Sequence, residues 1–350
     1  MMKKVGILFG GKSAEHEISL LSAKNVFDAI DRTKYDPVMI KIDKSGQWQI
    51  QPSLSLSARE WTGEGSLSDM APQFDVIFPI LHGPFGEDGT VQGYLKLADI
   101  PFVGPDVLGS AVGMDKDVMK RLLRDAQIPI GKFLVLNSHD QAPSFADIVN
   151  TLGSPVFIKP ANMGSSVGIS KVSNEVEFAS ALKDAFQYDT KVIIEEFIAG
   201  REIECAVLGN ENPAASLPGE IIPSHDFYSY DAKYIDDKGA SLQIPANLDE
   251  GTTKRIQELA VKVFQVLCCE GLSRVDFFLK ASSASQPSSA KQPYEIIVNE
   301  INTMPGFTKI SMYPKMWEAS GIGYTELITR LIELAISRFE RNRQLKTSVV

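Results

Sequence analysis

Apolar runs alternate with glycine turns and helix-forming stretches through the first third of the chain. In chain order these are an apolar run, a helix-like stretch and two further apolar runs, over residues 4–9, 18–30, 37–42 and 74–81. The first run ends at Gly10-Gly11 and the last ends at His82-Gly83. The order of strand, glycine turn, helix and strand predicts a βαβ unit. Ligands of such sheets bind beyond the carboxyl ends of the strands, where both glycine turns lie.

The middle of the chain repeats this alternation in shorter pieces. Asp115 has the position of a helix N-cap, helix formers follow to about Ala126, and Pro129 ends the segment. Short apolar runs that predict strands lie at 132–136, 155–159, 191–195 and 202–208. They indicate a small α+β module, with the first domain boundary near its start.

The last third combines long helical patterns with two strong strands. Helices are predicted over about 252–268 and 324–341, and strands over 273–279 and 294–302. The two strands are separated by residues 281–293, a stretch dominated by Ser, Ala, Gln and Pro. We interpret this low-complexity stretch as a loop without a function of its own.

Length and composition place the chain among folded, multidomain proteins. Its 350 residues exceed the about 250–300 that one core organises, so we expect two or three domains. The composition, 44% hydrophobic and 23% charged, is typical of a globular protein. The net charge of -9 argues against a surface that binds duplex nucleic acid, although it leaves a basic pocket possible.

Cysteine usage and the N-terminus bear on the compartment. Cys205, Cys268 and Cys269 neither form a disulfide framework nor have metal-site spacing, which indicates reduced thiols and a cytoplasmic location. Lys3-Lys4 followed by an apolar run resembles the start of a signal peptide, but the run is too short. No stretch approaches the roughly 20 apolar residues of a membrane span. We therefore expect no membrane partner and no nucleic-acid partner.

Charged residues alternate along both strong strands of the last third. Arg274 and Asp276 share one face of their strand, and Glu300 and Asn302 share one face of the next. If these strands pair, all four side chains converge. Two carboxylates and an amide oxygen suit magnesium, and an arginine beside them would stabilise developing negative charge. The competing interpretation is a ladder of salt bridges on an exposed sheet face.

Two further segments have features of a nucleotide site. Lys159 ends a predicted strand and precedes the glycine–serine loop 164–168, whose N–H groups could bind phosphate, although the pattern is not a Walker motif. Most such loops are ordinary turns. The stretch 195–198, followed by Glu202 and Glu204, could bind a base and ribose, or could be a solvated acidic rim.

Both glycine turns of the first third also carry polar candidates. Glu15 follows Gly10-Gly11 near a predicted helix start, where it could bind a substrate ammonium group or simply complement the helix dipole. His82 opens the loop 82–89, which contains three glycines and a proline. It could contact substrate or shuttle a proton, although a lone histidine is more often structural.

Taken together, these segments resemble the D-alanine–D-alanine ligases of the ATP-grasp superfamily over nearly the whole chain. The resemblance rests on motifs in a specific order, at 10–20, 82–90, 114–116, 159–168, 232–234, 274–276 and 299–308. It implies an α/β and α+β fold, in which a Rossmann-like domain precedes a two-lobed ATP-grasp fold. The expected domains are 1–115, the central lobe 116–210 and the C-terminal lobe 211–350. Met312, where many members have leucine, and the long 281–293 loop depart from the family pattern.

The resemblance also implies a role for each motif residue. ATP would be bound between the lobes by Lys116, Lys159, Ser166, Glu195, Glu196, Ile198, Glu202, Lys233 and Asn299. Two magnesium ions, or manganese in their place, would be held by Asp276, Glu300 and Asn302. The two D-alanine molecules would meet the catalytic residues Glu15, Ser165, Tyr234, Arg274, Gly306 and Ser311, with His82 and Met312 as further substrate contacts.

The implied reaction joins two D-alanine molecules through a D-alanyl phosphate, releases ADP and phosphate, and supplies a peptidoglycan precursor. Tyr234 favours an amine over a lactate hydroxyl as the nucleophile. The family resemblance also implies a homodimer. Two alternatives stay open: a ligase that uses D-lactate or D-serine as acceptor, and a nucleotide-binding regulator without catalysis.

Overall fold

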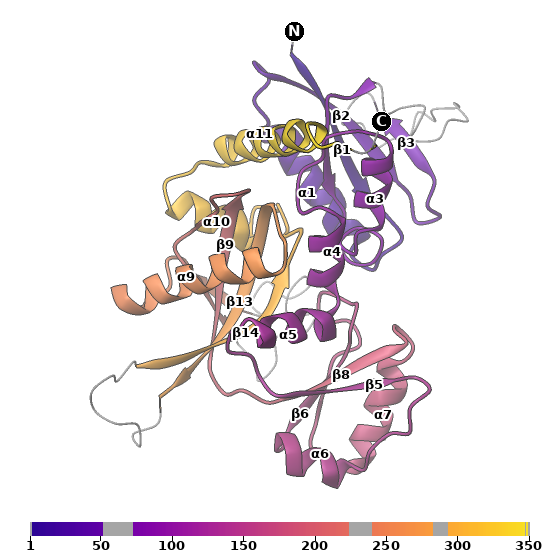
Figure 1. Ribbon diagram of the computed structural model, residues 1–350, viewed down its shortest axis with the longest axis vertical. Coiled ribbons are helices and arrows are strands. Elements are labelled where there is room, and N and C mark those ends of the chain that lie inside the picture. Colours follow the sequence, from indigo (N-terminus) through magenta and orange to yellow (C-terminus); the bar gives the residue numbers. More distant parts are fainter. Residues whose placement is uncertain (1, 52–72, 224–239, 283–292, 347, 349–350) are drawn as a thin grey trace.

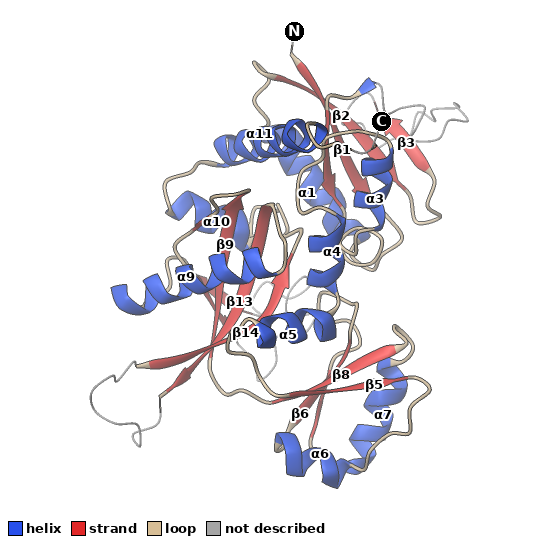
Figure 2. Ribbon diagram, viewed as in Figure 1, coloured by secondary structure: helices blue, strands red, loops and turns tan. Residues whose placement is uncertain are grey.

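Three β-sheets with their helices make up the part of the chain that the computed structural model describes, residues 2–51, 73–223, 240–282, 293–346 and 348 (Figure 1). The N-terminal sheet lies at one end of the molecule and the central sheet at the other (Figure 2). The C-terminal sheet lies between them. This arrangement leaves two seams where side chains from different sheets can meet.

The N-terminal sheet has the strand order β3-β2-β1-β4. Strand β1 pairs in parallel with β2 and β4, which confirms the predicted βαβ unit, and β3 is antiparallel to β2. The elements are β1 (Lys3–Gly10), α1 (His16–Ala29), β2 (Tyr35–Ile42), β3 (Trp48–Gln51), β4 (Val76–Ile80), α3 (Thr90–Leu97) and α4 (Val107–Met114).

The central sheet is antiparallel, with the order β5-β8-β6-β7. Asp115 caps the helix that leads into it, since its side chain accepts from the backbone N–H groups of Asp117 and Val118. The elements are α5 (Lys116–Asp125), β5 (Phe133–Asn137), α6 (Phe145–Leu152), β6 (Val156–Pro160), β7 (Ser170–Val172), α7 (Glu175–Ala185) and β8 (Lys191–Glu196).

The C-terminal sheet has the order β12-β11-β9-β13-β14, with β10 paired to β9. Helices α9 and α10 pack against β9. The elements are β9 (Arg201–Gly209), β10 (Ala214–Ala215), β11 (Gly219–Pro223), β12 (Ala240–Gln243), α9 (Glu250–Val266), β13 (Gly271–Ala281), β14 (Tyr294–Asn302), α10 (Met312–Ala319) and α11 (Tyr324–Arg343).

Two of the three regions share one hydrophobic core. Helix α11 lies beside α1 and contacts β4, so that the last helix of the chain covers the first sheet (Figure 1). Phe307, which is fully buried, packs edge-on against Phe78 of β4 with ring centroids 5.8 Å apart. By contrast, the central sheet has its own core, built from residues such as Ile158, Phe178 and Ile194.

The structure corrects several expectations about elements. Strand β9, expected within the central lobe 116–210, pairs with β13 and belongs to the C-terminal sheet. The sheet therefore changes at residues 197–200, between β8 and β9, rather than after residue 210. The structure also contains shorter elements that the sequence analysis did not predict, namely β3, β7, β10, β11, β12, α3, α4, α6, α7 and α10. Among the described residues, no helix is long and apolar enough to cross a bilayer.

Arg338 of α11 joins the last helix to the N-terminal region. Its buried guanidinium donates to the carbonyl oxygens of Gly104 and Phe102, the latter at 2.7 Å, and lies 4.7 Å from the Phe102 ring centroid. We expect Arg338→Met to lower the free energy of unfolding by about 2–4 kcal/mol, because two buried carbonyls lose their donor. Guanidinium denaturation would measure this change.

Arg343→Met is the matched control on the same helix. Arg343 forms an exposed ion pair with Asp99 at 3.6 Å, and such pairs contribute little to stability. An equal loss of stability in both variants would contradict the role given to Arg338.

Candidate functional site

The predicted pairing of the two strong strands is confirmed, and it gathers their charged residues. Strands β13 and β14 are antiparallel, with Arg274 opposite Asn302 and Asp276 opposite Glu300. On the other side of β13, Glu204 of β9 lies opposite Asp276. One basic side chain and several acidic ones therefore occupy neighbouring positions of three strands.

Arg274 makes a two-pronged ion pair within this group. Its Nε and Nη2 atoms each lie 2.7 Å from an oxygen of Asp276, and Nε also lies 3.0 Å from Glu204. Burial alone would lower the pKa of Arg274, but Asp276 and Glu204 outweigh it and raise the pKa well above the ordinary value. Arg274 therefore stays charged. The salt-bridge interpretation is right about this contact, yet the pair is largely buried rather than solvated.

The oxygen donors beside Arg274 fit a magnesium ion by their chemistry. Asp276, Glu300 and Asn302 offer two carboxylates and an amide, and magnesium commonly takes one or two carboxylates plus phosphate and water oxygens. Both Asp276 oxygens bond to Arg274, so the arginine fixes the orientation of this carboxylate. Within the described ranges, no cluster of three or more His, Cys, Asp or Glu side chains could hold a metal.

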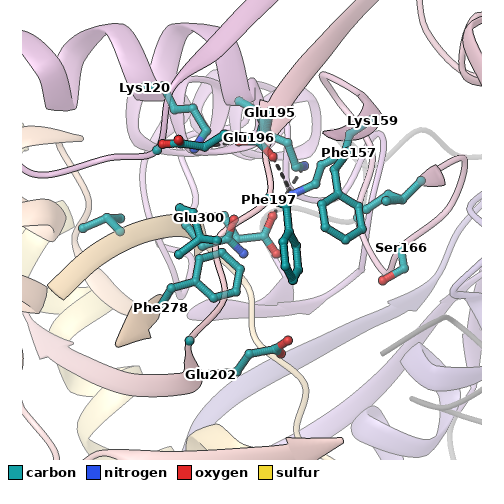
Figure 3. A pocket seen from close by; sticks show the side chains of 18 of the residues that line it. Lys120, Phe157, Lys159, Ser166, Glu195, Glu196, Phe197, Glu202, Phe278 and Glu300 are labelled. Atoms are coloured by element: carbon teal, nitrogen blue, oxygen red, sulfur yellow. Dashed lines mark ion pairs between the residues drawn. The ribbon is translucent and has the colours of Figure 1, made fainter. Parts of the chain in front are cut away.

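A pocket of about 270 Å³ lies between the central and C-terminal sheets (Figure 3). Phe157 of β6, Phe197 after β8 and Phe278 of β13 provide apolar walls around the charged groups. Ten of the predicted site residues line this pocket: Lys116, Lys159, Ser165, Ser166, Glu195, Glu196, Ile198, Glu202, Asn299 and Glu300. The structure thus brings together segments that lie far apart in the sequence.

Glu195 lies between two lysines at the back of the pocket. Its carboxylate oxygens lie 2.7 Å from Lys120 Nζ and 2.6 Å from Lys159 Nζ. Burial alone would raise the pKa of Glu195, but the two ammonium groups outweigh it and hold the pKa well below its ordinary value. Glu195 is therefore an anionic acceptor. The interpretation as a solvated acidic rim is wrong for Glu195 and Glu204, which are both buried.

Lys120 was missed by the sequence analysis. It lies four residues after Lys116 on α5, so both ammonium groups project from the same face of the helix. Lys116 Nζ donates to the Met163 carbonyl at 2.6 Å and lies 3.8 Å from Glu300. The spacing of the two lysines was the signal that could have found Lys120.

The glycine–serine loop connects this pocket to the N-terminal region. Ser165 and Ser166 have φ angles of 51° and 62°, a left-handed conformation that non-glycine residues seldom adopt. The Ser165 hydroxyl donates to the carboxylate of Glu15. Backbone conformations of this kind occur preferentially at functional sites.

Glu15 faces three loops rather than its own helix. It precedes α1, yet its side chain makes no capping hydrogen bond. A Cβ placed on Gly83 would lie 2.9 Å from Glu15 Oε2, and one placed on Gly164 would lie 3.4 Å from it. The carboxylate thus lies where the loops after β1, β4 and β6 meet. This position favours ligand binding over the interpretation that Glu15 only complements the helix dipole.

His82 is buried beside Glu15 and bonds through one ring nitrogen. Its Nδ1 lies 3.1 Å from the carbonyl oxygen of Met304, so Nδ1 carries the proton. Burial lowers the pKa of His82, although Glu15 opposes this, and the ring is neutral. Its Nε2 has no hydrogen-bond partner in the described part of the chain. Nε2 is therefore an available acceptor.

Gly306 and Ser311 lie close together in the segment that follows β14. Ser311 Oγ accepts from the Thr308 backbone N–H at 2.9 Å, and a Cβ on Gly306 would lie 2.8 Å from it. The side chain of Met312, a predicted substrate contact, is buried in the core beneath Gly219. Its apolar character explains this, and only its backbone, at the first residue of α10, can still face a ligand.

Two predicted site residues, Lys233 and Tyr234, lie outside the described residues. Besides Lys120, the sequence analysis also missed Glu87, although it lies in the shaped loop 82–89. Burial and the nearby Glu15 raise the pKa of Glu87 to about 8, against the opposing effect of two backbone N–H groups and Arg274.

Comparison with known proteins points to one family. The model described as D-ala D-ala ligase N-terminus matches residues 4–105, and the model described as D-ala D-ala ligase C-terminus matches 122–333. The D-alanine–D-alanine ligase of Oceanobacillus iheyensis is 54% identical over 99% of both chains.

Solved structures agree with this result. The D-alanine–D-alanine ligase from Coxiella burnetii superposes with a TM-score of 0.82 at 38% identity, covering 98% of this chain and 96% of that one. The ligase from Bacillus anthracis complexed with ATP gives a TM-score of 0.76 at 26% identity, covering 97% and 99%.

The lysine–glutamate cluster predicts a pH-dependent loss of stability. We expect Glu195→Gln to lower the free energy of unfolding by about 3–5 kcal/mol at neutral pH, because two buried lysines lose their counter-charge. The folded-state pKa lies below the ordinary value of 4.5, so the stabilisation is present above pH 4.5 and is lost as the pH falls. Urea denaturation should therefore show a smaller difference from wild type in more acidic buffer.

The control for this comparison is Glu258→Gln. Glu258 forms an exposed pair with Lys254 at 3.9 Å, and its loss should change stability little. A difference between wild type and Glu195→Gln that grew on acidification would contradict the assignment of Glu195 as a buried anion.

Proposed function

The chain belongs to the D-alanine–D-alanine ligase family, and from this premise we propose that it uses ATP to join two D-alanine molecules into D-alanyl-D-alanine. The observation that carries the proposal is the continuity of the site. The pocket between the lobes is lined by Glu300 and Ser165, among others, and Ser165 in turn contacts Glu15 in the N-terminal region. Such a product would serve peptidoglycan synthesis.

The nucleotide would occupy the pocket between the lobes. Glu195, kept anionic by its lysines, would accept from the adenine amino group, with Glu196 and Ile198 alongside. Glu202 would bind the ribose, while Lys116, Lys159 and Ser166 would bind phosphate and Asn299 would line the phosphate end. We propose that Lys159 exchanges part of its ion pair with Glu195 for the nucleotide phosphates.

Magnesium would be held by Asp276, Glu300 and Asn302, with manganese as a substitute. When bound, the metal would supply positive charge that offsets the charge on the phosphates. Arg274 lies against Asp276 at 2.7 Å and would bring a further positive charge to the same place.

The two D-alanine molecules would lie between Glu15 and the Gly306–Ser311 turn. Glu15, oriented by Ser165, would bind the ammonium group of the first, and His82 Nε2 would accept from a substrate N–H. Ser311 and the Met312 backbone N–H, at the start of α10, would bind the carboxylate of the second.

In the proposed reaction, a carboxylate oxygen of the first D-alanine attacks the γ-phosphorus of ATP, and ADP leaves. The amine of the second D-alanine then attacks the carbonyl carbon of the D-alanyl phosphate. Inorganic phosphate leaves and keeps the carboxylate oxygen that attacked phosphorus in the first step. Arg274 and the Gly306 N–H would stabilise the tetrahedral oxyanion. Lys233, predicted to bind ATP, and Tyr234, predicted to be catalytic, lie outside the described residues, and the tyrosine favours an amine acceptor over D-lactate.

Mixing the chain with ATP, magnesium and D-alanine and following ADP release tests this proposal. We expect D-alanine-dependent release with the dipeptide as product by mass, and loss of release when EDTA removes the metal. D-Lactate and D-serine, added as competing acceptors, should yield little product. Depsipeptide as the sole product, or ATP binding without turnover, would contradict the proposal.

We also propose a cytoplasmic homodimer, since ATP and reduced thiols are cytoplasmic and the family resemblance implies a dimer. We expect light scattering of the purified chain to give twice the chain mass of 38.4 kDa. A monomer mass at micromolar concentration would overturn the assembly without affecting the proposed reaction.

A further inference from the structure

Glu87 bridges two segments that lie far apart in the sequence. Its side chain is buried in the loop between β4 and α3. One carboxylate oxygen accepts from the Gly83 backbone N–H at 2.7 Å, and the other accepts from the Met304 backbone N–H at 3.2 Å. Met304 follows β14 in the C-terminal region. A single side chain therefore joins the first region to the last.

The two segments that Glu87 joins border opposite sides of the proposed D-alanine site. Gly83 lies directly against the carboxylate of Glu15, which would bind the first D-alanine. Met304 lies two residues before Gly306, which would face the oxyanion. His82 adds a parallel contact to the same segment, since its Nδ1 donates to the Met304 carbonyl oxygen.

From these contacts we infer that Glu87 is a positioning residue, which holds the His82–Gly83 loop against the Met304–Gly306 turn and so sets the distance between the two D-alanine subsites. This inference rests on the proposed function. Glu87 itself would touch neither substrate nor nucleotide, because its two oxygens are directed at the backbone.

A carboxyl group is well suited to this position. Both of its oxygens can accept from a backbone N–H group, since the hydroxyl oxygen of the protonated form keeps acceptor capacity, whereas a glutamine offers one acceptor and turns its own N–H group toward the other donor. An apolar side chain would leave both buried N–H groups without a partner, at a cost of about 1–3 kcal/mol each. Because the two donors belong to different segments, losing both hydrogen bonds would let the Gly83 loop and the Met304 segment move apart.

Gln92 supports the same loop without sharing this role. Gln92 of α3 donates to the Gly86 carbonyl at 2.7 Å, which ties the same loop to its own helix but not to the C-terminal region. Replacing Gln92 removes the contact between the loop and α3, whereas replacing Glu87 removes the contact between the loop and the C-terminal region. The two contacts can therefore be tested in separate variants.

The test compares Glu87→Met, Glu87→Gln and Gln92→Met with wild type. For each, the D-alanine dependence of ADP release, the affinity for a non-hydrolysable ATP analogue and the thermal midpoint are measured. We expect Glu87→Met to raise the KM for D-alanine about tenfold or more, as loss of a buried hydrogen bond implies, with nucleotide affinity unchanged. Glu87→Gln should lie between wild type and Glu87→Met, and Gln92→Met should resemble wild type in KM.

Several outcomes would overturn the inference. They are a D-alanine KM unchanged in folded Glu87→Met, an equal rise in Gln92→Met, or a parallel loss of nucleotide affinity. If Glu87→Met does not fold, the KM for D-alanine and the nucleotide affinity of Glu87→Gln are compared with wild type and with Gln92→Met in the same way. Failure of the wild-type chain to turn over D-alanine would instead contradict the proposed function, so the two failures are distinguishable.

Discussion

The site depends on the antiparallel register of β13 and β14. That register sets Arg274 opposite Asn302 and Asp276 opposite Glu300, and β9 adds Glu204 on the other side. A slip of one residue would turn the charged side chains of one strand to the opposite face of the sheet. The buried cation Arg274 is tolerated because Asp276 and Glu204 surround it, and the acidic residues are tolerated because of Arg274. Burying any one of these charges is therefore tolerated only because the opposite charges are buried beside it.

The remainder of the molecule supports this group from two sides that have different hydrophobic cores. The N-terminal and C-terminal regions share a core through Phe78 and Phe307, so the proposed D-alanine site lies across a well-packed seam. The central sheet has a separate core and meets the C-terminal sheet around the polar pocket. A nucleotide bound there would contact both lobes. The D-alanine side would be preorganised, and the nucleotide side would depend more on its ligand.

Local patterns predicted much of this arrangement. Alternation along 273–279 and 294–302 placed the four polar side chains on paired faces, and a lysine at a strand end indicated Lys159 as a pocket residue. The roles of these residues came from family resemblance rather than from pattern. What local patterns could not supply was partner choice between distant segments, since β9 fits the central sheet equally well by sequence but pairs with β13.

Buried polar residues were the hardest to predict, because their meaning comes from groups that are distant in sequence. In the sequence Glu87 has no feature that sets it apart from other loop glutamates. Its contact with the Met304 backbone N–H, 217 residues away in the chain, is evident only in the structure. Lys120 resembles a solvated helix residue until Glu195 is placed 2.7 Å from it. Met312 shows the converse, since it follows the polar Ser311 in the chain while its side chain packs in the core.

The most direct test of the account follows an oxygen atom through the reaction. D-Alanine labelled with oxygen-18 in its carboxylate would be turned over with ATP and magnesium, and the inorganic phosphate would be analysed by mass. If the carboxylate oxygen attacks the γ-phosphorus, each phosphate released should carry one labelled oxygen, because the acyl phosphate breaks at its carbonyl carbon. Unlabelled phosphate, with all of the label in the dipeptide and unreacted D-alanine, would contradict the D-alanyl phosphate and the proposed site roles built on it.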